Sequence, residues 1–406
     1  MEIPSPQALL ERVRSLPAGR PLLARLDDAI GVHLVGGAVR DLLIGGEPDD
    51  LDLVVEGDAA ALARRLDEAP RIHDRFGTST VRLDGFTYDL ARARRETYAR
   101  PGALPDVAPA TLSDDLKRRD FTVNALALAL GAPRPGELTS VPSALDDLAA
   151  RRLRALHDAS FIDDPTRLLR LVRYASRLGF AIEPHTLALA RAAVLARALD
   201  TVTGSRIGTE LRLLAREPDP LAAIATLHEL RLDSAIHPDF GLTDLALGRR
   251  AFLLLPADGH SDRLALALAL RGVPRKEVRA LLDRLAFEAA DRDAILAAAT
   301  RAPSLAAALE RARRPSEIAE AAAGAGPELV ALAGALGPAT NARDWLTRLR
   351  HVQLEIDGSE LLAAGIQEGP AVGRGLQAAL AGKLDGRVSG RAAELAVALE
   401  AAQDNG

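Results

Sequence analysis

Residues 32–55 read VHLVGGAVRDLLIGGEPDDLDLVV, and this stretch decides the fold. The apolar run at 32–35 predicts a short strand, the two glycines after it predict a tight turn, and 38–43 predicts a helix. The alternating run at 51–55 predicts a second strand. Glycines at the end of a strand and the start of a helix let the backbone approach a phosphate, although a lone Gly-Gly more often marks a plain turn.

A pair of carboxylates belongs to the second predicted strand. Asp50 and Asp52 are two residues apart, so the period of a strand puts both on one face and Asp49 on the other. Neighbouring carboxylates repel, and Mg²⁺ is the natural cation between them, since it takes hard oxygen ligands and substrate phosphates. A two-metal site would activate a 3′-hydroxyl and stabilise leaving pyrophosphate. By itself Asp-x-Asp is more often a solvated pair on an edge strand.

The pattern Gly-Gly-x-Val-Arg-Asp-x-Leu-x-Gly followed by Asp-x-Asp resembles the head-domain signature of class II tRNA nucleotidyltransferases (CCA-adding enzymes) and bacterial poly(A) polymerases. The resemblance implies an α+β head with the DNA polymerase beta-like nucleotidyltransferase fold. It implies that Asp50 and Asp52 are catalytic metal ligands. It also implies that Gly36, Gly37 and Arg40 contribute to nucleotide binding, with the glycines against the triphosphate.

One helix and two more strands complete the predicted head. Asp58 caps an amphipathic helix that ends at Leu66, and 78–83 and 86–91 look like antiparallel strands joined by a tight turn. Asp89 lies where the family places a third carboxylate on a neighbouring strand. Judged from the residues alone, a surface strand position explains Asp89 nearly as well.

Residues 118–125, RRDFTVNA, match a second motif of the same family. The string by itself predicts a helix start, with Asp120 near the cap and 125–130 continuing the helix. Asp120 and Asn124 then share one helical face. The resemblance implies that Arg119 and Asp120 contact phosphate and ribose, and that Asp120 and Asn124 offer hydrogen bonds to ribose hydroxyls.

Residues 163–167, DDPTR, carry chemistry that can select a base. Cytosine and adenine both present an exocyclic amine donor beside a ring-nitrogen acceptor, and uracil and guanine present the reverse. A carboxylate with a guanidinium therefore fits C and A and opposes U and G. Asp164 and Arg167, three apart on a helix, supply that pair. The family's nucleotide-selecting motif Glu-Asp-x-x-Arg matches this place, with Asp163 in place of Glu.

Structural alternatives remain open for the same residues. Pro165 is typical of a first helical position, which makes Asp164 the N-cap, or else Asp163 caps the helix and Asp164 stays free. Asp164 and Arg167 can also form only an intrahelical ion pair, worth about 0.2–0.5 kcal/mol.

Arginines recur at every third residue after this motif, at Arg167, Arg170 and Arg173. They predict a basic row along triphosphate or primer RNA, and a solvated helix face is the alternative. Residues 96–116 are mostly irregular, at the position where CCA-adding enzymes hold a flexible loop that helps the switch from C to A. Its presence disfavours a C-only enzyme, and the string PGALP at 101–105 resembles a subgroup that includes A-adding enzymes.

From about residue 140 onward, helical spacing of apolar residues dominates. We therefore predict a nucleotidyltransferase head at 1–140, followed by an all-α neck, body and tail. The neck, 141–210, carries the nucleotide-selecting motif, the body covers 211–290, and the tail, 291–406, binds tRNA.

The composition limits the class of protein. A formal net charge of -5 argues against a generally basic nucleic-acid surface, so RNA contacts require local arginine stripes. The absence of cysteine excludes disulfides and thiolate metal sites. No apolar run approaches the ~18 residues of a membrane span, and the N-terminus lacks a secretory signal, so we expect a cytoplasmic protein with no membrane partner.

These motifs predict template-independent addition of CMP and/or AMP from CTP and ATP to the 3′ end of a tRNA, with Mg²⁺. The product is a full or partial CCA end, A-addition included. The alternative is a poly(A) polymerase acting on other RNA 3′ ends. A binding module with a decayed active site is opposed by the complete set of acids. An enzyme that modifies proteins or antibiotics would need neither the base-reading pair nor the long helical part.

Overall fold

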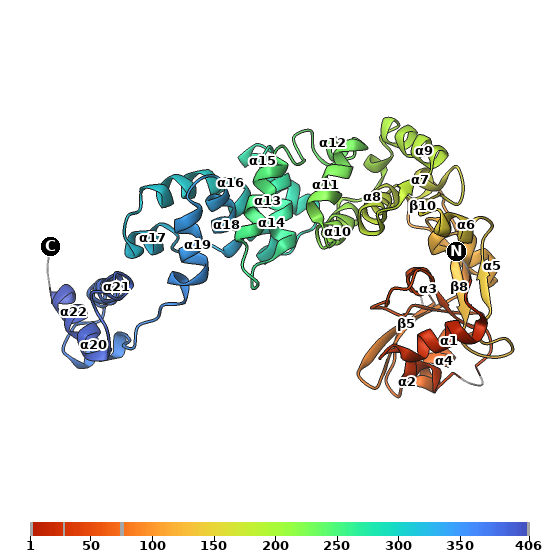
Figure 1. Cartoon of the computed structure of the whole chain (residues 1–406), viewed down its shortest axis with the longest axis horizontal. Helices are drawn as coiled ribbons and strands as arrows, with labels where there is room; N and C mark the ends of the chain where they lie inside the picture. The colour runs from red at the N-terminus through yellow and green to blue at the C-terminus, as the bar shows by residue number, and fades with distance from the viewer. Residues whose placement is uncertain (1–2, 27–28, 74–76, 404–406) are drawn as a thin grey trace. The chain divides into compact units, whose positions relative to one another are not determined.

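The computed structural model describes residues 3–26, 29–73 and 77–403, and it divides the chain into two compact units, 1–210 and 211–406 (Figure 1). The first unit holds a mixed sheet with helices around it. Our finer division into head, neck, body and tail stays a prediction.

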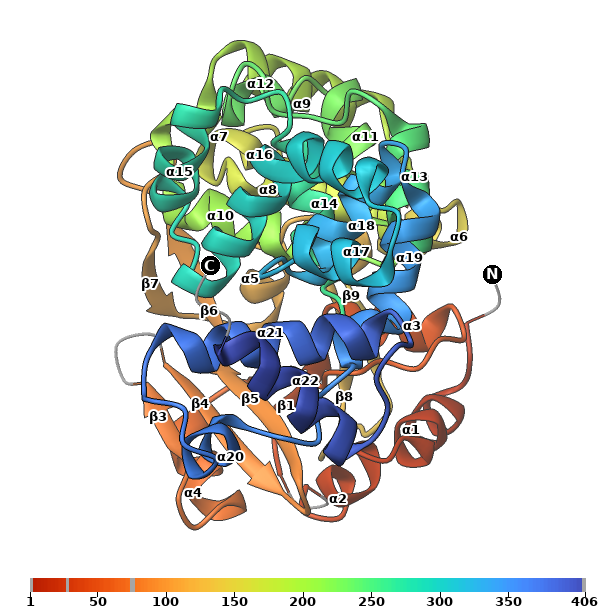
Figure 2. The same cartoon turned by 90° about the vertical axis from the view of Figure 1, so that its left-hand side faces the viewer.

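Seven strands of the first unit form one sheet with the order β3-β4-β5-β2-β1-β8-β9 (Figure 2). The strands β2 and β5 pair in parallel, and the other neighbours are antiparallel. Their bounds are β1 (Val32–Val35), β2 (Leu53–Val55), β3 (Arg71–His73), β4 (Thr78–Leu83), β5 (Phe86–Arg92), β8 (Leu126–Ala129) and β9 (Leu138–Ser140). The central strands β2 and β8 are buried at every position, which places the core of the head on both faces of these strands.

Most of the predicted head elements are confirmed. The strands β1, β4 and β5 lie where the apolar alternation placed them. Helix α3 (Gly37–Leu43) follows the glycine turn, and α4 (Ala59–Leu66) is capped by Asp58, whose carboxylate accepts two main-chain N–H groups at 3.0 Å. The local signals sufficed here because caps and tight turns depend on neighbouring residues alone.

One predicted strand is shorter than expected, and one predicted helix is wrong. Strand β2 is confirmed but begins at Leu53, so Asp50 and Asp52 precede it instead of lying within it. The run 125–130, predicted to continue a helix, is strand β8, preceded by the single 3₁₀ turn η2 (Thr122–Asn124). A short apolar run fits a buried strand as well as a helix, and here pairing with β1 and β9 decides the outcome.

The segment 96–116, expected to be mostly irregular, holds regular structure. Strands β6 (Arg94–Thr97) and β7 (Asp106–Pro109) form an antiparallel ribbon, and helix α5 (Leu112–Lys117) follows. Thr111 and Asp114 form a capping box at the start of α5. Only the connection between β6 and β7 is irregular, and we call residues 98–105 the β6–β7 loop.

The rest of the first unit is mainly helical, with one small parallel ribbon of β10 and β11. The bounds are α1 (Pro6–Ser15), α2 (Gly19–Leu23), α6 (Ala144–Ala149), β10 (Arg152–Leu153), α7 (Ser160–Asp163), α8 (Thr166–Leu178), β11 (Ala181–Ile182), α9 (Pro184–Leu195), η3 (Ala198–Thr201) and α10 (Gly204–Ala215). Helix α10 runs across the boundary between the two units. The glycine Gly179 ends α8 in the left-handed conformation that favours this residue.

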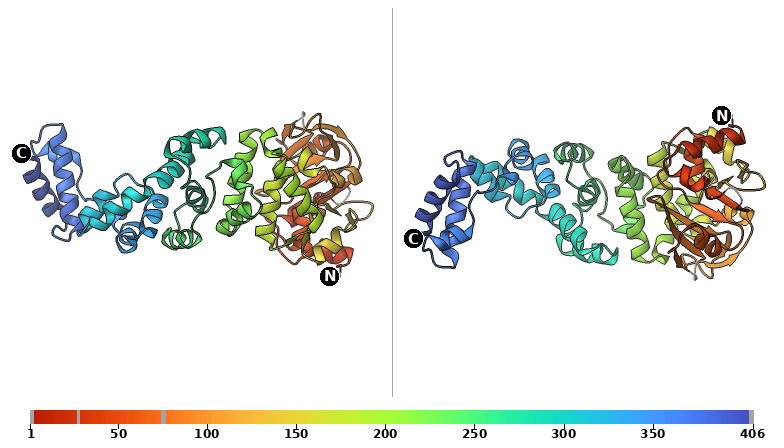
Figure 3. Two further views of the ribbon diagram at one scale, coloured as in Figure 1. Left: turned by 90° about the horizontal axis from the view of Figure 1, so that it is seen from above. Right: turned by 90° about the horizontal axis from the view of Figure 1, so that it is seen from below.

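The described residues of the second unit form helices only, in agreement with the prediction (Figure 3). The bounds are α11 (Pro220–Glu229), α12 (Asp233–Ile236), α13 (Leu245–Leu254), α14 (Ser261–Ala269), α15 (Arg275–Arg284), α16 (Ala289–Arg311), α17 (Pro315–Ala321), α18 (Pro327–Ala335), α19 (Ala339–Thr347), η4 (Leu349–His351), α20 (Gly358–Ala363), α21 (Pro370–Leu384) and α22 (Arg391–Gln403). The last three helices enclose a small core of their own around Leu361. In the described part of the chain, no helix combines the length and the apolarity that crossing a membrane requires.

Candidate active site

A cavity of about 350 Å³ in the first unit collects residues from all three motifs. The predicted residues that line it are Gly36, Gly37, Asp52, Arg119, Asp120, Asn124, Asp164, Arg167 and Arg170. Residues that are separated by more than a hundred positions thus meet in one place. The predicted residues Asp50, Asp89, Arg40, Asp163 and Arg173 lie outside this lining.

The glycine turn between β1 and α3 is held in a conformation that only glycine adopts readily. Gly36 has φ +73° and ψ -133°, and its N–H donates to the main-chain carbonyl of Leu126 on β8 at 3.0 Å. A Cβ at Gly36 would lie 3.0 Å from Nη1 of Arg119. The turn therefore needs glycine for its backbone angles and for the close approach of Arg119.

Two carboxylates, Asp52 and Asp89, lie side by side where β2 and β5 begin to pair. The register places Leu53 beside Leu90, so Asp52 and Asp89 occupy equivalent positions one residue earlier. Asp89 accepts a hydrogen bond from Thr80 Oγ1 at 2.7 Å. Burial raises the pKa of Asp52, and the negative charges of Asp89 and Asp50 raise it further, against the opposing charge of Arg119.

A second cavity of about 400 Å³ is lined by both Asp52 and Asp89, so Asp52 borders two cavities. Asp50 is exposed and lines neither. The exposed–buried alternation from Asp50 to Leu53 nevertheless keeps the predicted common face of Asp50 and Asp52, although the strand itself begins later.

The second motif forms a buried chain of hydrogen bonds, although the predicted helix is absent. Asn124 accepts from Arg40 Nη1 at 2.6 Å and donates to Asp120 Oδ1 at 3.0 Å. Arg170 binds Asp120 Oδ2 through Nε at 2.9 Å and Nη2 at 2.6 Å. Asp120 and Asn124 are thus neighbours, as predicted, because the turn η2 brings them together.

The Asp120 carboxylate is held in its ionised form. Burial alone would raise its pKa, but the charge of Arg170 and the hydrogen bonds from Asn124 and the Phe121 N–H outweigh burial and lower the pKa to about 2. Arg40 is 2% exposed and is held by Asp41 and Asn124. The geometry therefore makes Arg40 a support for Asn124, whereas the sequence suggested direct contact with nucleotide.

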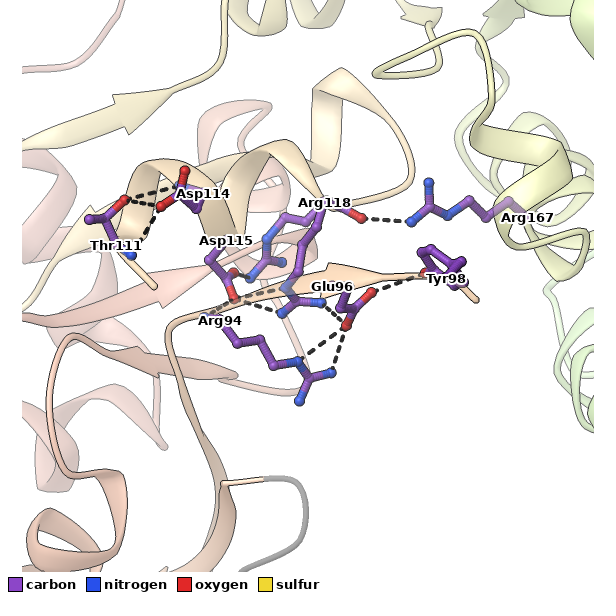
Figure 4. Close-up of polar contacts among 9 residues, drawn as sticks. Arg94, Glu96, Tyr98, Thr111, Asp114, Asp115, Arg118 and Arg167 are labelled. Carbon is purple, nitrogen blue, oxygen red and sulfur yellow. Dashed lines mark hydrogen bonds and ion pairs between the residues drawn. The ribbon is translucent and has the colours of Figure 1, made fainter. Parts of the chain in front are cut away.

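A cluster of charges around α5 positions two arginines of the second motif (Figure 4). Asp115, fully buried, accepts from Arg118 at 2.7 Å and from Arg119 at 3.0 Å. Arg118 also donates to Glu96 of β6 at 2.8 Å, and Tyr98 donates to the other oxygen of Glu96 at 3.1 Å. In the structure, Nε of Arg119 is buried and makes no hydrogen bond. That donor is left available at the wall of the cavity.

The third motif begins a helix, and its two key side chains do not bind each other. Asp164 Oδ1 accepts from the Thr166 N–H at 3.1 Å and from Thr166 Oγ1 at 2.6 Å, so Asp164 does cap the start of α8. Arg167 is buried and donates to Ser160 Oγ at 2.7 Å and to the Arg118 carbonyl at 2.6 Å (Figure 4). The alternative of an Asp164–Arg167 ion pair is therefore wrong. Asp163 belongs to α7, and its carboxylate lies 4.0 Å from His157 Nδ1.

The row of arginines on α8 is not a solvated face. Arg167 is buried, Arg170 binds Asp120, and Arg173 Nη1 lies 3.3 Å from Glu210. Only the first two line the cavity. The predicted role of the row along triphosphate or primer RNA stays a prediction, and acidic residues of the same unit pair with Arg170 and Arg173.

Sequence reasoning missed five residues of the lining. Four of them belong to the β6–β7 ribbon with its loop or to the residue after α5, and their presence depends on how these segments fold; the five are Glu96, Tyr98, Pro105, Arg118 and Tyr174. Tyr174 offered no signal beyond its place on α8, where its ring packs edge-on against Phe121 at 5.9 Å.

Comparison with known proteins gives the same assignment. Residues 32–154 match the family model described as the poly A polymerase head domain. An A-adding tRNA nucleotidyltransferase of Geobacter sulfurreducens is 43% identical over 242 residues, which are 56% of this chain and 27% of that protein. The chain spans between about a quarter and a half of the length of the A-adding relatives that it matches.

Two further comparisons extend over most of the chain. A CC-adding tRNA nucleotidyltransferase of Deinococcus radiodurans is 38% identical over 356 residues, which cover 84% of this chain and 82% of that protein. A solved structure of the Thermotoga maritima CCA-adding enzyme complexed with tRNA superposes with a TM-score of 0.75 at 27% identity, over 98% of this chain and 99% of that one. On this evidence the chain belongs to the family of class II tRNA nucleotidyltransferases and bacterial poly(A) polymerases.

Proposed function

We propose that this protein adds CMP and/or AMP from CTP and ATP to the 3′ end of tRNA without a nucleic-acid template, and so makes or repairs all or part of the CCA end. The observation that carries the proposal is one cavity whose lining contains two sets of groups. The glycine turn and Asp52 suit a triphosphate. Asp164 and Arg167 suit the edge of a base.

The base-selecting part of the proposal rests on which atoms of these two side chains are occupied. Within the described residues, the hydrogen bonds of the Asp164 carboxylate all use Oδ1, so Oδ2 is the acceptor left for an exocyclic amine. Ser160 and the Arg118 carbonyl fix the plane of the Arg167 guanidinium at the cavity wall. A guanidinium only donates, so it suits the ring-nitrogen acceptor of C and A and opposes the ring N–H of U and G.

The family generally uses a divalent metal, and we propose Mg²⁺ for this chain. Within the described residues, no group of three Asp, Glu, His or Cys side chains gathers closely enough to hold an ion by itself. The donor set nevertheless suits Mg²⁺, which one or two carboxylates hold together with substrate phosphates. Asp50 and Asp52 would hold it, with Asp89 as the third candidate, and the ion would offset the burial and the neighbouring negative charges that raise the pKa of Asp52. When bound, the ion would activate the 3′-hydroxyl and stabilise the leaving pyrophosphate.

The chain's own residues would supply geometry and charge. The glycine turn and Arg119, with its free buried Nε, would hold phosphate oxygens, and Asp120 and Asn124 would orient the ribose from their hydrogen-bonded chain. Positioning of this kind is what phosphoryl transfer mainly demands of a protein. A tRNA substrate would place the protein in the cytoplasm, as its composition predicts.

A nucleotide-incorporation assay tests the proposal. Labelled CTP or ATP is offered, with Mg²⁺, to tRNAs that end at each of the last three positions. We expect incorporation of CMP, AMP or both, and little of UMP or GMP. Use of ATP alone, after two cytosines, would define an A-adding enzyme. No incorporation on any tRNA would contradict the proposal.

The second candidate is a poly(A) polymerase, which the family model of the head favours. The same assay separates the two, because long ATP tails on RNAs other than tRNA would indicate that function. Both candidates use the same cavity, and they differ in the RNA that is recognised.

A further inference from the structure

The tip of the β6–β7 loop is fixed by main-chain carbonyls of α7 and by Arg206, which lies outside all three sequence motifs. The Gly102 N–H donates to the carbonyls of Ile162 and Asp163 at 3.2 and 3.3 Å, and the Gly102 carbonyl accepts from Arg206 Nη1 at 2.9 Å. Gly102 has φ +68°, and a Cβ there would clash with Thr201. The loop tip is therefore held through both the N–H and the carbonyl of Gly102, at a position that only glycine fits.

The same guanidinium reaches the carboxylate proposed to select the base. Arg206 Nη2 donates to Asp164 Oδ1 at 2.8 Å, and this oxygen also accepts both donors of Thr166. Three donors on Oδ1 fix the plane of the carboxylate. They leave Oδ2 in a fixed position as the oxygen that can accept a further hydrogen bond. Arg206 is about one-fifth exposed, so solvent competes weakly for these bonds.

The loop and the carboxylate meet in the same cavity. Tyr98 and Pro105, at the two ends of the β6–β7 loop, line it together with Asp164 and Arg167. A change at Arg206 would thus alter two walls of the base site at once. It would remove the donor to the Gly102 carbonyl and leave the loop tip held through the Gly102 N–H, and it would leave the Asp164 carboxylate held by Thr166 alone.

We infer that Arg206 is a positioning residue that couples the β6–β7 loop to Asp164 and thereby sets nucleotide selectivity. The inference rests on the proposed function. It requires arginine, because a planar guanidinium can hold the Gly102 carbonyl and the Asp164 carboxylate with two N–H groups of fixed geometry, whereas lysine offers one point charge.

The test measures equilibrium binding of CTP, ATP, GTP and UTP with Mg²⁺ to the full chain and to its variants. In Arg206→Ala we expect the ratio of the affinities for the tightest-bound and the weakest-bound nucleotide to fall by about tenfold or more. This is the effect of losing a charge-assisted hydrogen bond. Arg206→Lys should restore only part of the ratio. Arg191→Ala, an exposed arginine on the nearby helix α9, is the control with the same change of charge and should leave the ratio unchanged.

A second variant keeps the test decisive if Arg206→Ala does not fold. Gly102→Ala should lower the same ratio, and the double variant should lose little more than the worse single variant, since both act on one coupling. An unchanged ratio in both single variants overturns the inference. If the variants bind all four nucleotides equally more weakly and also have a lower Tm, the inference is overturned as well, because this result indicates a purely structural role for Arg206. If the wild type binds nucleotides selectively but transfers none to tRNA, the proposed function is contradicted. The affinity ratios of the variants would still test the role of Arg206.

Discussion

At the residue scale, the site depends on side chains that hold one another before any substrate binds. The chain from Arg40 through Asn124 and Asp120 to Arg170 consists of buried or half-buried groups with good hydrogen-bond geometry. A buried network in which every member is satisfied keeps its shape, because breaking one bond leaves a neighbouring charge or amide unpaired. This rigidity is what a cavity that positions reactants needs.

The depressed pKa of Asp120, about 2, makes a pH-dependent contribution to stability. An acid whose pKa is lower in the folded state stabilises the fold above its ordinary pKa, and this stabilisation is lost as pH falls from about 4 to about 2. The shift corresponds to about 2 kcal/mol. We expect the difference in unfolding free energy between wild type and Asp120→Asn, measured by urea denaturation, to shrink by this amount over that range.

The control for this measurement is Asp106→Asn, which makes the same change of charge at an exposed position of β7. Its stability should follow that of the wild type closely through the acid range. If the Asp120→Asn and wild-type curves stay parallel from pH 6 to the lowest accessible pH, the Asp120–Arg170 pair does not stabilise the fold in the way described.

At the element scale, the last three helices form a small cluster whose core is separate from the head. Leu361 of α20 is 0% exposed within this core, whereas Leu362, its neighbour on the same helix, is 43% exposed. We expect Leu361→Ala to reduce the stability of this cluster by about 2–5 kcal/mol, because it leaves a cavity. Leu362→Ala should change it by less than about 0.5 kcal/mol.

Hydrogen exchange of the amides in α20, α21 and α22 measures this effect, since it reports opening of each helix separately. The head amides should be unaffected by either substitution. Equal effects of the two leucine variants would show that the described packing of α20 is incorrect.

Strand β1, helix α4 and the β4–β5 hairpin followed from caps, turns and alternation, which are encoded by adjacent residues. Strand β8 did not, because Leu126–Ala129 is an apolar run whose state is decided by β1 and β9 on either side. The residues of the three motifs were found because their spacing resembles a family pattern.

What the sequence did not predict were the partners of those residues. Arg40 and Arg173 are residues of a type that binds phosphate. In the structure, however, Arg40 donates to Asn124 and Arg173 pairs with Glu210. Glu96 and Arg206 carry no local signal of function, since their roles arise from contacts across 22 and 42 positions of the chain. Long-range pairing of charges is a property of the fold that residue spacing alone does not encode.

At the scale of the whole molecule, an acidic chain is proposed to bind a polyanion. The sequence has 51 Lys and Arg against 56 Asp and Glu, so any tRNA contact must use local groups of cations. Binding through phosphates releases counterions and therefore weakens steeply with salt. We expect tRNA affinity to fall at least about tenfold between roughly 50 and 200 mM salt, measured by filter binding or fluorescence anisotropy. Affinity that is independent of salt would exclude recognition of the RNA backbone.

The central claim is that neighbouring acids hold a divalent ion against a nucleoside triphosphate at the glycine turn. Calorimetric titration of ATP and of CTP into the full chain, with and without Mg²⁺, tests it in the wild type and in Asp52→Asn. We predict that Mg²⁺ tightens binding of at least one of the two nucleotides by about tenfold or more in the wild type, and that Asp52→Asn removes most of this gain. An equal Mg²⁺ effect in both proteins, or no triphosphate binding by the folded wild type, would contradict the account.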